Sequence, residues 1–318
     1  MSAIGKAGTL SAGMSKKKNL RQRIWQARYL YLMLLPLLIW LAVLCYGPMY
    51  GIILAFKEYN AKLGILRSPW VGLKHFRRIF STPDAKRALA NTLLINFGKL
   101  VFCFPFPIIL ALLITEMPGR RTKKVYQTVL TFPHFLSWVV ISTILTNFLA
   151  QSGAINLLLA NLGFEKINFL GNAKLFRWML FLTDNWKEAG WAAIIYMAAI
   201  AGVDLELYDA ARVDGAGRLR LIWHVTLPGI KPTIAIMFIL QVGAMMSGGF
   251  DQVFNLRNDA VISVAQTLDT YIYDITFSAV SNYGFSTAVG LFTAVANFIF
   301  LILANWFVYR MTGDKMLS

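Results

Sequence analysis

Polar residues interrupt the long apolar stretches of this 318-residue chain. Around residues 89–115, Asn96 lies one helical turn before Lys99, and around residues 176–203 a polar run lies among aromatic residues. A charged side chain buried in hydrocarbon costs about 3 kcal/mol on insertion scales, so such residues are functional candidates. The candidates are Asn96, Lys99, Asn185, Trp186, Lys187, Glu188, Tyr196 and Gln241.

Hydrogen-bonding groups beside aromatic faces suit a sugar ring, which carries hydroxyl groups and an apolar C–H face. The chain supplies both kinds of group in Asn185, Trp186, Glu188, Tyr196 and Gln241. Structural roles fit these residues too. Lys187 can extend to the membrane interface or pair with a neighbouring acid, and amide side chains often hold membrane helices together. The sequence leaves both readings open.

Enzymatic chemistry has little support. The three histidines, His75, His134 and His224, are far apart and lack the spacing of metal ligands. The chain has no Gly-x-Ser-x-Gly elbow, and it has no Gly-x-x-x-x-Gly-Lys-Ser/Thr loop to bind ATP. Its two cysteines lie in apolar segments, where packing is the expected role. We therefore predict no catalytic residue, no metal site and no cofactor bound by this chain.

The stretch 208–228, YDAARVDGAGRLRLIWHVTLP, lies between two apolar segments and is too basic to face lipid. Asp209, Ala210 and Ala211 favour a short helix. Gly215 and Gly217 allow a turn or a close backbone approach, and a second helix is expected to end at Pro228. An ordered loop on one side of a membrane is the resulting prediction.

This stretch resembles the EAA loop of ATP-binding-cassette (ABC) importer permeases, in the branch that takes up carbohydrates. The matching positions are Asp209, Ala210, Ala211, Asp214, Gly215, Ala216, Leu227 and Pro228. The family pattern begins with Glu and has Ile where this chain has Val225. The resemblance extends from about Tyr31 to the C-terminus and is greatest to permeases for fragments of complex polysaccharides.

The resemblance implies a type I ABC importer permease fold, in which this loop forms a coupling helix on an ATPase subunit. Asp209 would cap or orient the helix, Ala210 and Ala211 would contact the ATPase, Gly215 would allow the turn, and Leu227-Pro228 would end the element. It also implies a second permease subunit, usually non-identical, two ABC ATPases that bind ATP and Mg²⁺, and a solute-binding protein outside the cell. The transported substrate would be an oligosaccharide.

Composition indicates an all-α, polytopic membrane protein, because 57% of residues are hydrophobic and 14% are charged. About six spans of roughly 20 residues are expected. They lie near 29–56, 89–115 (kinked at Phe104–Pro107), 126–150, 176–203, 232–250 and 285–309. Gly243–Gly249 would allow close packing or a bend of the fifth span. The polar segment 251–283 would receive the binding protein or form an interfacial segment.

Residues 1–28 form a basic tail without a signal-peptide core, so residues 29–318 are expected to be one permease domain. The net charge of +16 reflects basic residues next to apolar spans, and nucleic-acid binding is not indicated. With both termini and the 208–228 loop in the cytosol, 17 Lys and Arg residues lie inside and 12 outside. The bacterial cytoplasmic membrane is the expected location. The basic segment 57–88 would lie outside and so is unfavourable for this orientation.

Two other classes of membrane protein fit the sequence less well. An ATP-independent secondary transporter for a small polar solute would often show related halves, which this chain lacks. A membrane-embedded enzyme would need catalytic groups that the sequence does not show.

Overall fold

The computed structural model describes residues 25, 27–278 and 282–312, and every regular element in those ranges is a helix. This confirms the predicted all-α class. The chain divides into two compact units, residues 1–52 and 53–318. The first unit contains α2 (Arg28–Trp40), the π-helical η1 (Leu41–Tyr46) and the start of the 3₁₀-helical η2 (Gly47–Phe56). The predicted basic tail lies almost entirely outside the described residues.

The second unit carries the remaining helices. They are α3 (Gly64–Arg67), α4 (Lys74–Ser81), α5 (Pro83–Phe102), α6 (Pro105–Glu116), α7 (Arg120–Thr131), η3 (Phe132–Phe135), α8 (Trp138–Leu149), α9 (Ala154–Asn161), α10 (Ala173–Ala201), α11 (Leu205–Val213), α12 (Arg218–Leu221), η4 (Ile222–Thr226), α13 (Leu227–Gly243), α14 (Phe250–Leu256), α15 (Ile262–Ala265), α16 (Leu268–Phe277) and α17 (Tyr283–Thr312).

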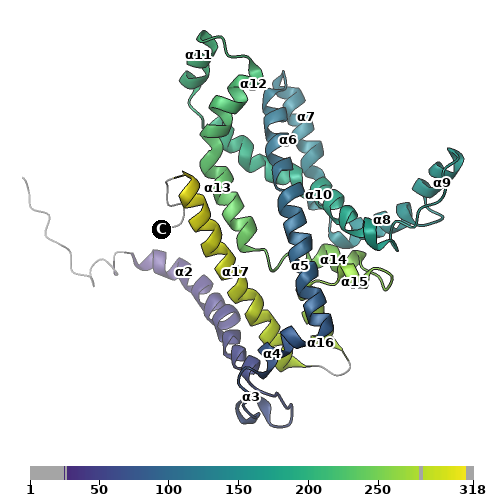
Figure 1. Cartoon of the computed structure of the whole chain (residues 1–318). Helices are drawn as coiled ribbons and strands as arrows, with labels where there is room; N and C mark the ends of the chain where they lie inside the picture. The colour runs from purple at the N-terminus through teal and green to yellow at the C-terminus, as the bar shows by residue number, and fades with distance from the viewer. Residues whose placement is uncertain (1–24, 26, 279–281, 313–318) are drawn as a thin grey trace, which may run out of the picture. The chain divides into compact units, whose positions relative to one another are not determined.

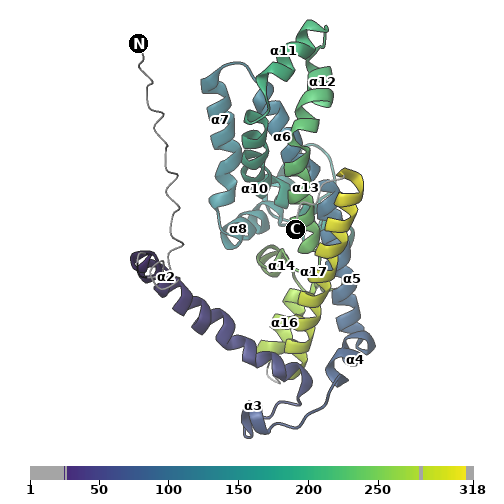
Figure 2. The same cartoon turned by 90° about the vertical axis from the view of Figure 1, so that its left-hand side faces the viewer.

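Long helices connect the two ends of this second unit. Figures 1 and 2 show α11 and α12 at one end and α3 at the other, with α5, α6, α10, α13 and α17 between them. We call these the α11 end and the α3 end. Near the α11 end, α6, α10 and α13 enclose an apolar cluster around Ala111, Tyr196 and Ile230. Near the α3 end, a second cluster around Ile79, Leu268 and Phe285 joins α4, α16 and α17.

Within the described residues, five helical segments are long and apolar enough to span a membrane, and a sixth forms when α10 and α11 are joined across their 71° bend. This agrees with the predicted number. The second span is broken between α5 and α6, next to the prolines that predicted a kink. Gly243 packs closely on α17, since a Cβ at this position would lie 2.8 Å from Leu301 Cδ1. Gly248 and Gly249 turn the chain with φ angles of 112° and 80°.

The third predicted span is not continuous. The α7 helix ends at Thr131, and α8 begins at Trp138 after the 3₁₀ turn η3. Pro133 lies in this turn, and the Lys187 ammonium group donates to the His134 carbonyl at 2.7 Å. Irregular backbone at membrane depth persists where protein groups satisfy its hydrogen bonds, and Lys187 does so here.

The described residues of segment 251–283 are largely helical, and α14, α15 and α16 bury Val253, Ala265 and Leu268 against the bundle. One further expectation is corrected. Pro228 does not end a helix. The chain passes from α12 through the π-helical η4 directly into α13, where Pro228 lies in the first turn. A proline there is tolerated because its missing N–H and fixed φ suit the start of a helix.

Candidate functional site

The loop between α10 and α13 is an ordered element with two defined caps. The Asp204 side chain accepts from the Glu206 N–H at 3.0 Å and caps the N-terminus of α11. The predicted cap, Asp209, instead lies inside α11 and pairs with Arg212 at 3.0 Å on the exposed surface. An Asp just before a helix is a strong local N-cap signal, so Asp204 was detectable from the sequence.

Gly215 ends α11 through a Schellman motif. Its φ is 76°, its N–H donates to the Arg212 carbonyl at 3.0 Å, and the Ala216 N–H donates to the Ala211 carbonyl at 2.9 Å. These are the paired bonds of that motif, and they need a residue in the left-handed region. A Cβ on Gly215 would meet nothing within 4 Å. Gly215 is thus required for backbone conformation and not for a close approach.

The loop exposes large apolar side chains. Val213 is 88% exposed, and Leu205, Leu219 and Trp223 are also largely exposed. The Tyr208 hydroxyl bonds to Thr226 Oγ1 at 3.0 Å and so links α11 to η4. Behind the loop, a cavity of about 960 Å³ extends to the ends of α6, α7 and α10. Large exposed apolar side chains on an ordered element are typical of a protein-docking site.

A second site lies along the middle of α10. A small cleft of about 110 Å³ opens between α6, α10 and α13. Four of the predicted substrate-path residues line it, namely Asn185, Glu188, Tyr196 and Gln241. Asp184, which the sequence reasoning did not select, lines it as well. The cleft therefore combines carboxylate, amide and phenol groups near the centre of a membrane helix.

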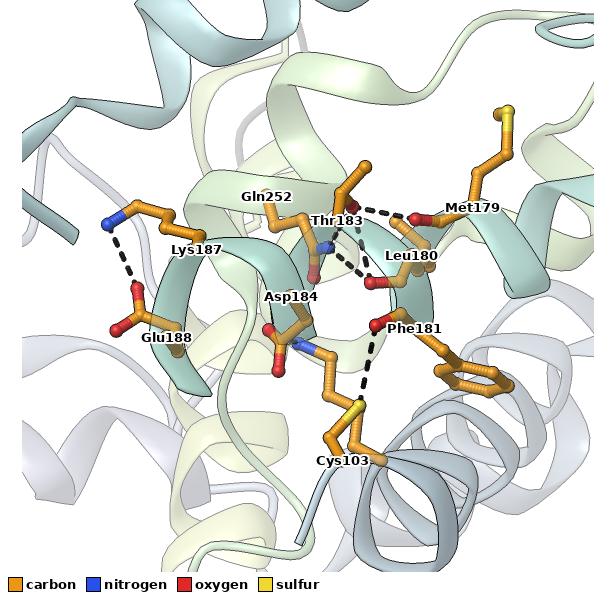
Figure 3. Close-up of polar contacts among 10 residues, drawn as sticks. Cys103, Met179, Leu180, Phe181, Thr183, Asp184, Lys187, Glu188 and Gln252 are labelled. Carbon is orange, nitrogen blue, oxygen red and sulfur yellow. Dashed lines mark hydrogen bonds and ion pairs between the residues drawn. The ribbon is translucent and has the colours of Figure 1, made fainter. Parts of the chain in front are cut away.

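The acidic groups of this cleft are neutralised by buried cations. Asp184 Oδ1 accepts from Lys99 Nζ at 2.7 Å, with 19% and 8% of the two side chains exposed. Lys187 Nζ lies 2.9 Å from Glu188 Oε1, and His134 Nδ1 lies 2.7 Å from Glu188 Oε2. Figure 3 shows Asp184, Lys187 and Glu188 on neighbouring turns of α10. Lys187 therefore pairs with an acid and does not extend to an interface.

Helix α14 is tied to the same turns. In Figure 3 the Gln252 amide reaches the backbone and side chain of α10, and its Nε2 donates to the Leu180 carbonyl at 2.8 Å and to Thr183 Oγ1 at 2.9 Å. On the other flank of α10 the His134 ring stacks on Trp191 at 4.5 Å. Polar contacts thus fix the central turns of α10 to three neighbouring segments.

The other predicted residues lie elsewhere. Asn96 Nδ2 donates to the Met245 carbonyl at 3.0 Å and joins α5 to the turn after α13. Lys99 and Lys187 are buried behind the cleft and are 6% and 5% exposed. Trp186 lines a separate apolar groove of about 330 Å³ beside α8. These four support or neighbour the cleft without lining it.

The structure is that of a polytopic helical membrane protein with an ordered, partly apolar loop at one end and a polar cleft along α10. Residues 104–313 match the model of the family described as binding-protein-dependent transport system inner membrane component. The chain belongs to this family. This confirms the predicted ABC importer permease and disfavours the ATP-independent transporter.

Two relatives are similar over nearly the whole chain. The polygalacturonan/rhamnogalacturonan transport system permease protein YteP of Bacillus subtilis is 45% identical, with 91% of this chain and 90% of the relative covered. Protein LplB of the same organism is 42% identical, with 97% and 96% covered.

A solved structure has the same fold. A chain of a bacterial ABC transporter involved in the import of the acidic polysaccharide alginate superposes with a TM-score of 0.85 and 35% identity. The superposition covers 93% of this chain and 100% of that chain. A second structure of a bacterial alginate ABC transporter, bound to a periplasmic protein that carries an alginate pentasaccharide, has a TM-score of 0.85 and 34% identity.

Proposed function

We propose that this permease subunit imports oligosaccharides derived from complex polysaccharides, and that the loop between α10 and α13, which contains α11, receives force from an ATPase subunit. The exposed apolar side chains of the loop carry this proposal, because an ordered loop that presents Val213 of α11, Leu219 of α12 and Trp223 of η4 to solvent favours a partner surface. One relative is a polygalacturonan/rhamnogalacturonan transport system permease protein, and the cleft on α10 offers hydrogen-bonding groups suited to sugar hydroxyls.

The proposed assembly contains this chain, a second, non-identical permease, two ATPases and a solute-binding protein. ATP and Mg²⁺ would bind to the ATPases, and the α11 end with both termini would face the cytosol. The α3 end would then face outward and receive the binding protein. The sugar-loaded periplasmic protein in one alginate transporter structure supports such a partner. Copurification in mild detergent followed by mass spectrometry tests this composition.

Gly215 provides the test of coupling. A Gly215→Val substitution forces a β-branched residue into the left-handed region, where such residues are rare outliers. We expect the complex to assemble and hydrolyse ATP while sugar uptake per ATP falls several-fold in proteoliposomes. Gly217→Val is the matched control, because Gly217 has a φ of −74° and also has open space around its Cα.

Equal uptake by the two variants would contradict the assigned role of the turn. Uptake that proceeds without ATP would contradict the proposed function itself.

A further inference from the structure

A second pocket lies beside α10, nearer to the α3 end than the cleft. It has a volume of about 470 Å³ and lies between the first half of α10 and the last turns of α5. We call it the cationic aromatic pocket and define it by Phe97, Phe102, Lys174, Arg177 and Trp178, which all line it. No residue that lines it is acidic.

Arg177 differs from Lys99 and Lys187, the two buried lysines of α5 and α10. Lys99 and Lys187 each contact a carboxylate, whereas Arg177 contacts only an amide, with Nη2 donating to Asn91 Oδ1 at 2.9 Å. Arg177 Nε is buried and has no acceptor among the described residues. A cation that is partly desolvated and not neutralised is unfavourable, and an incoming carboxylate would relieve this. Its planar guanidinium matches a carboxylate in two parallel hydrogen bonds.

Arg177 is also held in position. Asn91, its partner, donates to the Ser263 and Gln266 carbonyls at 3.1 Å each. The guanidinium is therefore oriented by the segment that joins α15 to α16. A binding group fixed by such neighbours loses less conformational freedom when a ligand arrives.

The aromatic side of the pocket is equally fixed. The rings of Phe102 and Trp178 lie 5.0 Å apart, and each lies within 6 Å of Phe181. Phe181 is seated against Gly98, where a Cβ would lie 2.1 Å from Cζ. Trp178 and Phe97 keep 50% and 60% of their surface exposed. They offer open aromatic faces beside two positive charges.

The pocket and the cleft lie along one face of α10. Residues 174, 178 and 181 line the pocket, and residues 185, 188, 192 and 196 line the cleft. These positions recur every three or four residues, which places them on one side of a helix. From Trp178 to Glu188 the rise is about 15 Å. Phe102 marks the boundary, because its carbonyl accepts from Asn185 Nδ2 at 3.3 Å.

We propose that the cationic aromatic pocket binds a uronic acid unit of the transported oligosaccharide and makes the permease selective for acidic sugars. Arg177 and Lys174 pair with the carboxylate, while Trp178 and Phe102 stack on the C–H face of the ring. The neutralised cleft then receives the next sugar units through their hydroxyl groups. This proposal depends on the proposed function, since it assigns a substrate class to the same path.

The test compares an oligogalacturonate with its methyl ester, which keeps the rings and removes the charge. Rates are measured in neutral-lipid proteoliposomes with the complete transporter and saturating binding protein, which is the same for every variant. We expect Arg177→Gln to reduce the preference for the acid about 10- to 100-fold, the range for a hydrogen bond to a charged group. Arg177→Lys should retain part of that preference. Arg87→Gln, a change at an exposed arginine in the second turn of α5, should leave it unchanged.

The outcomes separate the two proposals. Uptake of neither sugar by the wild-type complex contradicts oligosaccharide import. Uptake with an unchanged preference in Arg177→Gln contradicts the pocket assignment. An anionic lipid is the competing occupant. If phosphatidylglycerol stabilises the wild type but not Arg177→Gln, and sugar preference stays the same, the pocket is a lipid site and the proposal is overturned. Unchanged methyl-ester transport by Arg177→Gln shows that the variant is folded.

Discussion

Two lysine–carboxylate pairs of equal length allow the effect of burial to be isolated. Lys99–Asp184 and Lys74–Glu58 both have N···O distances of 2.7 Å. The side chains of the first pair are 8% and 19% exposed, and those of the second are 65% and 44% exposed. In the exposed pair, the hydrogen bond from Lys74 holds the pKa of Glu58 below its usual value. Geometry is shared, so a difference in stability must come from the surroundings.

We expect Lys99→Met to lower the free energy of unfolding by about 3–5 kcal/mol, because it leaves the Asp184 charge buried and unpaired. Lys74→Met should change it by less than about 1 kcal/mol, the usual range for an exposed pair. Denaturation of the purified chain in mixed micelles measures both. The double variant Lys99→Met/Asp184→Leu removes both charges and should recover most of the stability lost in the single variant.

The reasoning fails if Lys99→Met and Lys74→Met have equal effects, or if adding Asp184→Leu gives no recovery. Activity is not a suitable readout for this cycle, because Asp184 also lines the cleft.

Three further substitutions test local packing and capping. Gly190→Ala should destabilise the protein by about 1–3 kcal/mol, because the new Cβ would lie 2.0 Å from the Leu130 carbonyl oxygen. Gly290→Ala is the control in the same denaturation assay. It should be neutral or stabilising, because Gly290 of α17 has open space around its Cα. Asp204→Ala should cost about 1 kcal/mol of local stability and increase hydrogen exchange in α11 without affecting other helices; unchanged exchange there would contradict the capping role.

The features that sequence predicted well are local ones. Span length follows from hydropathy, so α5–α6, α10 and α17 appear close to their expected positions. The turn at Gly215 follows from one residue's access to the left-handed region. A kink near Phe104–Pro107 follows from the prolines there. Each of these depends on a few neighbouring residues, which the sequence displays directly.

The features that sequence missed depend on distant partners. The break after Thr131 is stabilised by Lys187, and the close approach of α7 to α10 requires Gly190. Neither contact is visible in the residues around position 132. Pro228 was predicted to end a helix because the residues around it do not reveal the π-helical turn that precedes it.

The site shows the same division. Sequence identified polar residues in α10 but not the side of the helix that each one occupies. Asn185 and Trp186 are adjacent, yet they line different cavities, because successive side chains on a helix point about 100° apart. The pairing of Lys99 with Asp184 joins two predicted spans; it was not predicted from the sequence, although opposite charges inside a membrane tend to pair.

The ion pairs also constrain how movement reaches the cleft. Helix α10 is continuous from Ala173 to Ala201, about 43 Å long at 1.5 Å per residue, and it bends by 71° into α11. Lys99 ties its middle to α5, and Lys187 ties the next turn to η3. A displacement of α11 must therefore pass along one helix that is held at the level of the cleft. The contacts of Lys99 with Asp184 and of Lys187 with the His134 carbonyl are buried and involve charged groups. We therefore expect α5 and η3 to move together with the middle of α10, so that a displacement of α11 would also displace the cleft.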